Sequence, residues 1–163
     1  MNVEPKLESR GKQPYLAVRT QVGIPFGEVL PALWEEVAGF LASKNIEPSG
    51  PPFIRYLTTD MAKKLNIEVG FPVAKGISGN ARITAGTFPE GRYAVLPYFG
   101  HFDNLVLVTA EFLAWAEKNN ITGQTTVTNG VEMWLGRIEW YPTNPAVETD
   151  PQKWQTELAF LVK

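Results

Sequence analysis

The sequence has 163 residues, with 15 basic and 17 acidic side chains and a net charge of −2. This length suits one domain, and the scattered basic residues argue against nucleic acid as a partner. The absence of cysteine excludes disulfides and thiolate metal sites, and the single histidine, His101, argues against a metal centre or a Ser-His-Asp triad, so we expect no metal and no cofactor.

Residues 1–13 are polar and lack the apolar stretch of a secretory signal, and no apolar run is long enough to span a membrane. We therefore expect a cytoplasmic protein without a membrane partner. Aromatic residues make up 12% of the chain. Such a content serves either core packing or a site that binds flat apolar ligands.

Hydrophobic periodicity predicts the order strand, helix, strand, strand in the first half of the chain. A strand at 14–22 precedes an amphipathic helix whose regular part begins near Leu30. Two strands follow, at 53–58 and 66–74, on either side of a charged turn at residues 60–64.

The second half of the chain repeats this order after one added strand. Asp103 is a good N-cap and marks the start of the second helix. The predicted elements are the added strand at 82–87, a strand at 92–98, a helix at 103–119, and strands at 132–141 and 155–162.

Sequence similarity between the halves supports a duplication. The segment Glu68–Val73 resembles Glu157–Val162, and both form the last strand of their half. We interpret residues 1–163 as a single domain, with one repeat at about 14–74 and another at about 81–163. The fold class is then α+β: a duplicated β-α-β-β arrangement with a curved antiparallel sheet, two long helices on one face and a ligand cleft between the halves.

Three glutamates alternate with apolar residues on the predicted strands. Alternation turns Glu68 and Glu157 away from the apolar, helix-facing side of their strands. Glu139 lies on the opposite side of its strand from Ile138 and Trp140, so we expect all three carboxylates to project toward one cleft on the face away from the helices. The alternative is that each glutamate lies on the solvated face of an antiparallel strand.

Several motifs resemble the GyrI-like effector-binding family. A Glu-x-Tyr-x-x-x-Pro segment occurs at Glu139–Pro145 and is followed by Thr156–Leu158. A Pro-x-Gly-x-Tyr-Ala segment occurs at Pro89–Ala94 and is followed by Gly100–Leu105. The strand Glu68–Val73 also looks like the family's first-half strand, so the resemblance covers nearly the whole chain.

The resemblance implies the duplicated fold and a ligand site between the halves, where an acidic residue at the position of Glu139 meets aromatic, often cationic, compounds. His101 stands where the family pattern has proline, and Trp140 replaces an aliphatic residue. Because only about a dozen residues precede the first predicted strand, we expect a stand-alone member without a helix-turn-helix module.

The leading hypothesis is a small-molecule-binding protein that senses or sequesters an aromatic compound, cationic or neutral, in an acidic cleft. Alternation puts Tyr56 and Trp140 on the helix side of the sheet unless a bulge intervenes. The candidate ligand-binding residues are Glu139, Tyr141, Glu157, Glu68, Tyr98, Tyr56, Trp140 and Phe71.

Two other functions stay open. The resemblance implies, for some stand-alone relatives, a hydrolase that opens strained cyclopropane rings in genotoxic natural products. In that case Glu139, Glu157 and Tyr141 are the candidate catalytic residues. Inhibition of gyrase through a protein surface ranks last. We expect His101 to cap or pack against a helix start rather than to carry protons.

Overall fold

The computed structural model of the protein describes residues 4–59 and 64–163, so most of the turn expected at 60–64 lies outside the described residues. Its helices and strands are β1 (Lys6–Arg10), β2 (Gln13–Val22), α1 (Leu30–Ser43), β3 (Phe53–Thr58), β4 (Leu65–Pro72), β5 (Ile83–Phe88), β6 (Gly91–Phe99), α2 (Leu105–Lys118), β7 (Thr125–Thr128), β8 (Val131–Trp134), β9 (Arg137–Trp140) and β10 (Gln155–Val162).

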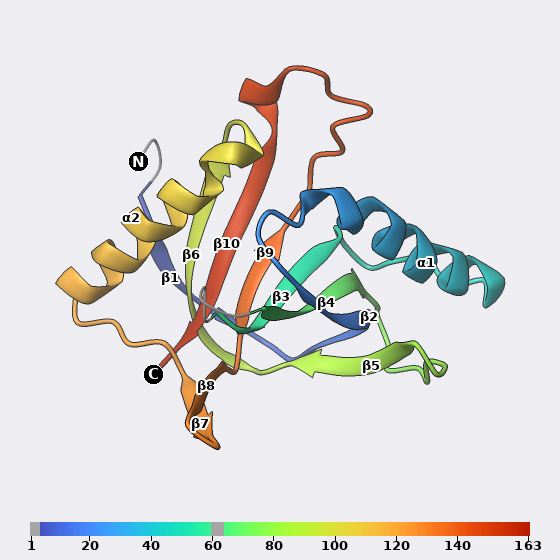
Figure 1. The fold of residues 1–163 in the computed structure, drawn as a ribbon, viewed down its shortest axis with the longest axis horizontal. Helices are drawn as coiled ribbons and strands as arrows, with labels where there is room; N and C mark the ends of the chain where they lie inside the picture. Colours follow the sequence, from blue (N-terminus) through green and yellow to red (C-terminus); the bar gives the residue numbers. More distant parts are fainter. Residues whose placement is uncertain (1–3, 60–63) are drawn as a thin grey trace.

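Eight of these strands form one antiparallel sheet in the order β1-β6-β10-β9-β3-β4-β2-β5 (Figure 1). Within it, β2-α1-β3-β4 and β6-α2-β9-β10 have the same element order and the same pairing pattern. The two halves meet where β3 pairs with β9. The expected α+β duplication is therefore confirmed, while the repeat boundaries at about 14–74 and 81–163 stay a prediction.

Both helices cover the same face of the sheet. Leu158 of β10 and Ile54 of β3 both lie opposite Glu139 of β9, so these three side chains share one face. Leu158 packs in a cluster with Phe112 of α2, and Ile54 packs in a cluster with Leu30 of α1. Glu139 is therefore on the helix-covered face.

The other face of the sheet is also buried. Tyr15, Phe88, Tyr93, Ile138 and Leu161 belong to one core cluster on that side. Phe88 comes from β5 at one end of the strand order, whereas Tyr93 comes from β6 near the other end. The sheet must curl strongly to bring them into one cluster, although no strand pairing closes it into a barrel within the described residues.

The region before β9 differs from the sequence expectation. The strand expected at 132–141 is interrupted, because residues 131–134 pair with β7 in a separate hairpin and the sheet strand begins at Arg137. Asn129 and Gly130 form the hairpin turn with φ of 53° and 76°. Positive φ at both central residues is typical of an Asn-Gly turn. The strand β1 was also missed by the sequence analysis.

The second helix begins later than the sequence analysis expected. Residues 102–104 form a turn of 3-10 helix, and the α-helix starts at Leu105. Asp103 is not the cap, because its backbone N–H donates to His101 Nδ1 at 3.0 Å. His101 therefore takes the capping role that was expected for it.

Candidate functional site

A buried carboxylate lies at the centre of the helix-covered face, on the central strand β9. Glu139 is 7% exposed. Its Oε1 accepts hydrogen bonds from the hydroxyls of Tyr56, at 2.8 Å, and Tyr141, at 2.6 Å. The two tyrosines come from different halves of the chain, so this three-residue cluster spans the junction between β3 and β9.

Aromatic residues from the segments that begin both helices surround the cluster. The Tyr141 ring lies 5.4 Å from Trp34 of α1 and 5.7 Å from Phe102, between ring centroids. Phe26, just before α1, lies 6.3 Å from the Tyr56 ring. These rings are half-buried. The carboxylate is thus enclosed by aromatic side chains that keep part of their surface exposed.

Burial sets the ionisation of the cluster. Loss of solvation raises the pKa of Glu139, although the two tyrosine hydroxyls and the nearby charge of Arg137 favour its ionised form. Burial and the Glu139 charge raise the pKa values of Tyr56 and Tyr141 well above 10. Both tyrosines therefore remain neutral hydrogen-bond donors at physiological pH.

Arg137 lies on the same strand face but interacts mainly with rings. Its guanidinium carbon is 5.0 Å from the Trp134 ring centroid, 4.9 Å from that of Phe160 and 5.6 Å from that of Tyr56. Burial lowers its pKa. Among residues 4–59 and 64–163, no basic group lies within 4.0 Å of the Glu139 carboxylate.

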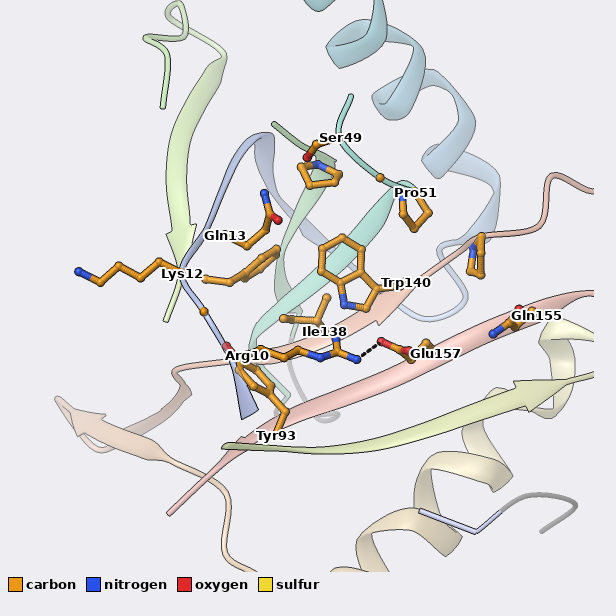
Figure 2. Close-up of a pocket in the computed structure, with 15 residues that line it drawn as sticks. Arg10, Lys12, Gln13, Ser49, Pro51, Tyr93, Ile138, Trp140, Gln155 and Glu157 are labelled. Carbon is orange, nitrogen blue, oxygen red and sulfur yellow. Dashed lines mark hydrogen bonds and ion pairs between the residues drawn. The ribbon is translucent and has the colours of Figure 1, made fainter. Parts of the chain in front are cut away.

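Glu157 lies on the opposite face of the sheet. It is the register partner of Trp140 on β9, and its Oε1 accepts a hydrogen bond from Arg10 Nη2 at 2.8 Å (Figure 2). Glu8 also pairs with Arg10, at 2.7 Å. The carboxylate of Glu157 is therefore neutralised by an ion pair within a network on the curled face.

Glu68 lies on that face too, in a separate buried network. It is 2% exposed. Its Oε1 accepts a hydrogen bond from the Tyr15 hydroxyl at 2.5 Å, and that hydroxyl accepts one from Arg55 Nη1 at 2.6 Å. Arg19 pairs with the other carboxylate oxygen at 3.4 Å. This arrangement connects β2, β3 and β4 and stabilises the interior of the curled sheet.

The expectation that three carboxylates share one cleft is therefore wrong. Glu139 faces the helices, whereas Glu68 and Glu157 face the curled side. Trp140 is also on the curled side, contrary to its expected orientation, because Ile138 and Trp140 pack into that second core. Tyr56 does face the helices, as alternation indicated, and a register shift follows it in β3.

The two remaining candidates contribute to the core beneath the helices. Phe71 packs against the cluster under α1 that contains Leu41. Tyr98 packs against the α2 cluster and donates its hydroxyl to the His101 carbonyl at 3.1 Å. Neither residue contacts the Glu139 carboxylate among the contacts of the described residues.

Sequence reasoning missed the aromatic residues that enclose Glu139. Trp34 falls within the predicted first helix and Phe102 within a family motif, and neither was named as a site residue. Each lies at or just before a helix start, where a ring can reach the centre of the sheet. Trp34 is fixed there by its Nε1, which donates to the Phe53 carbonyl at 3.1 Å.

Two further features of the described residues bear on function. No cluster of three or more His, Asp or Glu side chains is arranged to hold a metal ion in the part of the chain that the structure describes. In the same part of the chain, neither helix combines the length and apolarity needed to cross a bilayer.

Solved structures with this fold include EcmrR, a protein that has also been solved in a complex with DNA. The C-terminal domain of EcmrR has a TM-score of 0.81 and 17% sequence identity, with 100% of this chain and 99% of that chain covered. EcmrR in its DNA complex has a TM-score of 0.78 and 17% sequence identity. The match covers 98% of this chain and 57% of the EcmrR chain. At these identities the likeness establishes the fold alone.

Two other similar structures are of different kinds. SAV2435, solved bound to tetraphenylphosphonium, has a TM-score of 0.62 and 13% identity, over 99% of this chain and 94% of that chain. A hydrolase from Listeria innocua has a TM-score of 0.64 and 16% identity, over 98% of this chain and 92% of that chain.

Sequence comparison assigns the family. No curated protein sequence matches the chain. The profile of the GyrI-like small molecule binding domain matches residues 4–163, which is nearly the entire sequence. The chain belongs to the GyrI-like small molecule binding domain family.

Proposed function

We propose that the protein binds an aromatic organic cation on the helix-covered face of the sheet, with Glu139 as the group that recognises its charge. The observation that carries this proposal is the buried carboxylate of Glu139, which has no basic partner within ion-pair distance among the described residues. An unpaired buried charge is costly, and a bound cation offsets that cost.

The surroundings suit the apolar part of such a ligand. Trp34 and Phe102 pack edge-to-face on the Tyr141 ring, and Phe26 packs edge-to-face on the Tyr56 ring. Both tyrosines donate to the carboxylate. Aromatic faces attract cations, and the attraction is larger in a desolvated site. The similar structure of SAV2435 with tetraphenylphosphonium makes this cation the natural first compound to test.

Isothermal titration calorimetry with tetraphenylphosphonium tests the charge role. We expect Glu139→Gln to weaken binding by at least about tenfold, since close charge pairs in buried interfaces contribute more than ~1.4 kcal/mol. The matched control is Glu157→Gln, which removes a carboxylate on the opposite face and should leave the affinity unchanged.

An uncharged compound of related shape completes the design. Wild type should prefer tetraphenylphosphonium over triphenylphosphine oxide, and Glu139→Gln should remove that preference. Equal affinities of wild type and Glu139→Gln for the cation would refute the proposal, whatever the absolute affinity. Equal losses in both glutamate variants would instead indicate a general electrostatic effect and would also contradict it.

Hydrolysis is the second candidate function. The raised pKa of Glu139, which favours the protonated carboxyl, supports it. A carboxyl whose pKa is raised by burial can donate its proton to the atom that takes the electron pair of the breaking ring bond. Water then adds to the electrophilic carbon and returns a proton to the carboxylate. Tyr141, hydrogen-bonded to the same oxygen, can orient that carboxyl. Mass spectrometry after incubation with a cyclopropane-bearing alkylating compound tests this role. A water-added product formed by wild type but not by Glu139→Gln is the expected result, and unchanged substrate argues against it.

A further inference from the structure

A cavity of about 610 Å³ opens on the face of the sheet away from the helices. It lies where the connection between β1 and β2, the loop before β3 and the first residues of β10 come together (Figure 2). This volume falls within the range of pockets that hold drug-sized molecules. The cavity is on the opposite face of β9 from Glu139, so it belongs to a different site.

Aromatic rings and prolines supply much of the apolar surface of the cavity. Tyr93 and Trp140 contribute aromatic surface, and Ile138, Pro51 and Pro72 add aliphatic surface. Prolines and aromatic rings lose little side-chain entropy when a ligand orders them. A flat apolar molecule can therefore be held against these surfaces at low entropic cost.

Two of the three charged groups that line the cavity are paired with each other, and the third, Lys12, points away from the other lining residues (Figure 2). Arg10 Nη2 donates to Glu157 at 2.8 Å, and Arg10 Nε donates to Glu8 at 2.7 Å. A charged ligand that contacts Arg10 or Glu157 has to break one of these pairs. An uncharged ligand binds without disturbing them, so the electrostatics of this cavity differ from those around Glu139.

One polar atom in the wall lacks a partner. Trp140 Nε1 is buried and has no hydrogen-bond acceptor among the described residues. A buried donor without an acceptor costs ~1–3 kcal/mol. In Figure 2 the nitrogen-bearing edge of the indole faces the side of the cavity that holds Arg10 and Glu157. A ligand acceptor at this side of the cavity can take the hydrogen bond that Trp140 Nε1 lacks.

We propose that this cavity is a second ligand site, for an uncharged planar compound that carries a carbonyl or ring-nitrogen acceptor. The rings hold the plane of the ligand, the paired ions exclude charged competitors, and Trp140 Nε1 donates to the acceptor. The site does not depend on Glu139, so it stands whether or not the cation-binding proposal holds.

The fluorescent ketone 6-propionyl-2-(dimethylamino)naphthalene is a suitable probe, because it is neutral and flat, carries one carbonyl and emits at shorter wavelength in apolar surroundings. Titration of wild type should give a saturable blue shift. Ser49→Trp and Gln155→Trp place bulk at two edges of the cavity (Figure 2). Each should weaken binding by about tenfold or more. Trp140→Phe, which removes the donor, should weaken it by about fivefold.

Glu139→Gln is the matched control and should bind the probe as wild type does, and tetraphenylphosphonium should not displace it. Ser49 is exposed and Gln155 is half-buried, so both substitutions spare the core, and circular dichroism checks that each variant is folded. The proposal is overturned if both folded variants bind the probe with wild-type affinity, or if tetraphenylphosphonium competes with it. If only one variant folds, its affinity alone decides.

Discussion

The affinity for an organic cation should depend on pH through Glu139. Burial raises the pKa of this carboxyl above its ordinary value of 4.5, so it takes up a proton at a higher pH than an exposed glutamate does. A cation binds the ionised form. Affinity should therefore be greatest above the raised pKa and should fall as the pH drops through it.

The size of this effect follows from proton linkage. Below the raised pKa, each unit of pH should lower the affinity by up to about tenfold, or ~1.4 kcal/mol, because one proton competes with one cation. Above that pKa the affinity should be constant. Tyr56 and Tyr141 do not titrate in this range, because their pKa values are raised well above 10.

Calorimetric titration with tetraphenylphosphonium between about pH 8 and about pH 5 measures the dependence. Running each pH in two buffers with different ionisation enthalpies counts the proton released on binding. Glu139→Gln should give a flat profile. A wild-type profile that parallels that of Glu139→Gln would refute the reasoning.

Two predictions concern stability. A carboxyl whose pKa is raised by folding stabilises the folded state below its unfolded pKa and loses that contribution as the pH rises through its folded pKa. In urea titrations, wild type should therefore gain stability relative to Glu139→Gln as the pH falls toward 4.5, and a constant difference would contradict this. Tyr15→Phe removes the hydroxyl that bridges Glu68 and Arg55, and it should lower the free energy of unfolding by ~1.5–3 kcal/mol, whereas Tyr98→Phe, which loses an exposed hydrogen bond, should have a smaller effect.

The sequence predicted the order of elements well because most of them have one clear pattern. Leu30, Val37 and Leu41 recur at helical spacing and are the buried residues of α1. The strand β1 could not be found in this way. Its residues are mostly polar, and its place in the sheet depends on backbone hydrogen bonds to β6, which leave no pattern of side chains.

The orientation of β9 could not be predicted. Alternation of polar and apolar residues shows which side of a strand faces the core only when the other side is exposed to solvent. Ile138 is 2% exposed and lies on the curled face, and Glu139 is 7% exposed and lies on the helix face. Both sides of the strand are therefore buried. The apolar residue was assigned to the helices by default, and the sequence held no sign of a second core on the other side.

The candidate site was therefore predicted in part. Glu139, Tyr56 and Tyr141 were named and do come together. Glu157 and Trp140 were named for the same cleft but lie across the sheet from it. Local alternation separates Trp140 from Glu139, whereas the face that Glu157 shares with Trp140 follows from the strand register, which is a long-range property.

Strand β9 is only four residues long, and its adjacent residues Glu139 and Trp140 face opposite sides of the sheet. One peptide unit joins their Cα atoms, so the two side chains leave the backbone ~3.8 Å apart and in opposite directions. A single short segment thus supplies a group to each of two chemically different surroundings, a carboxyl group among aromatic rings on one side and a neutral donor beside paired ions on the other. Either side chain can be replaced while the other keeps its surroundings.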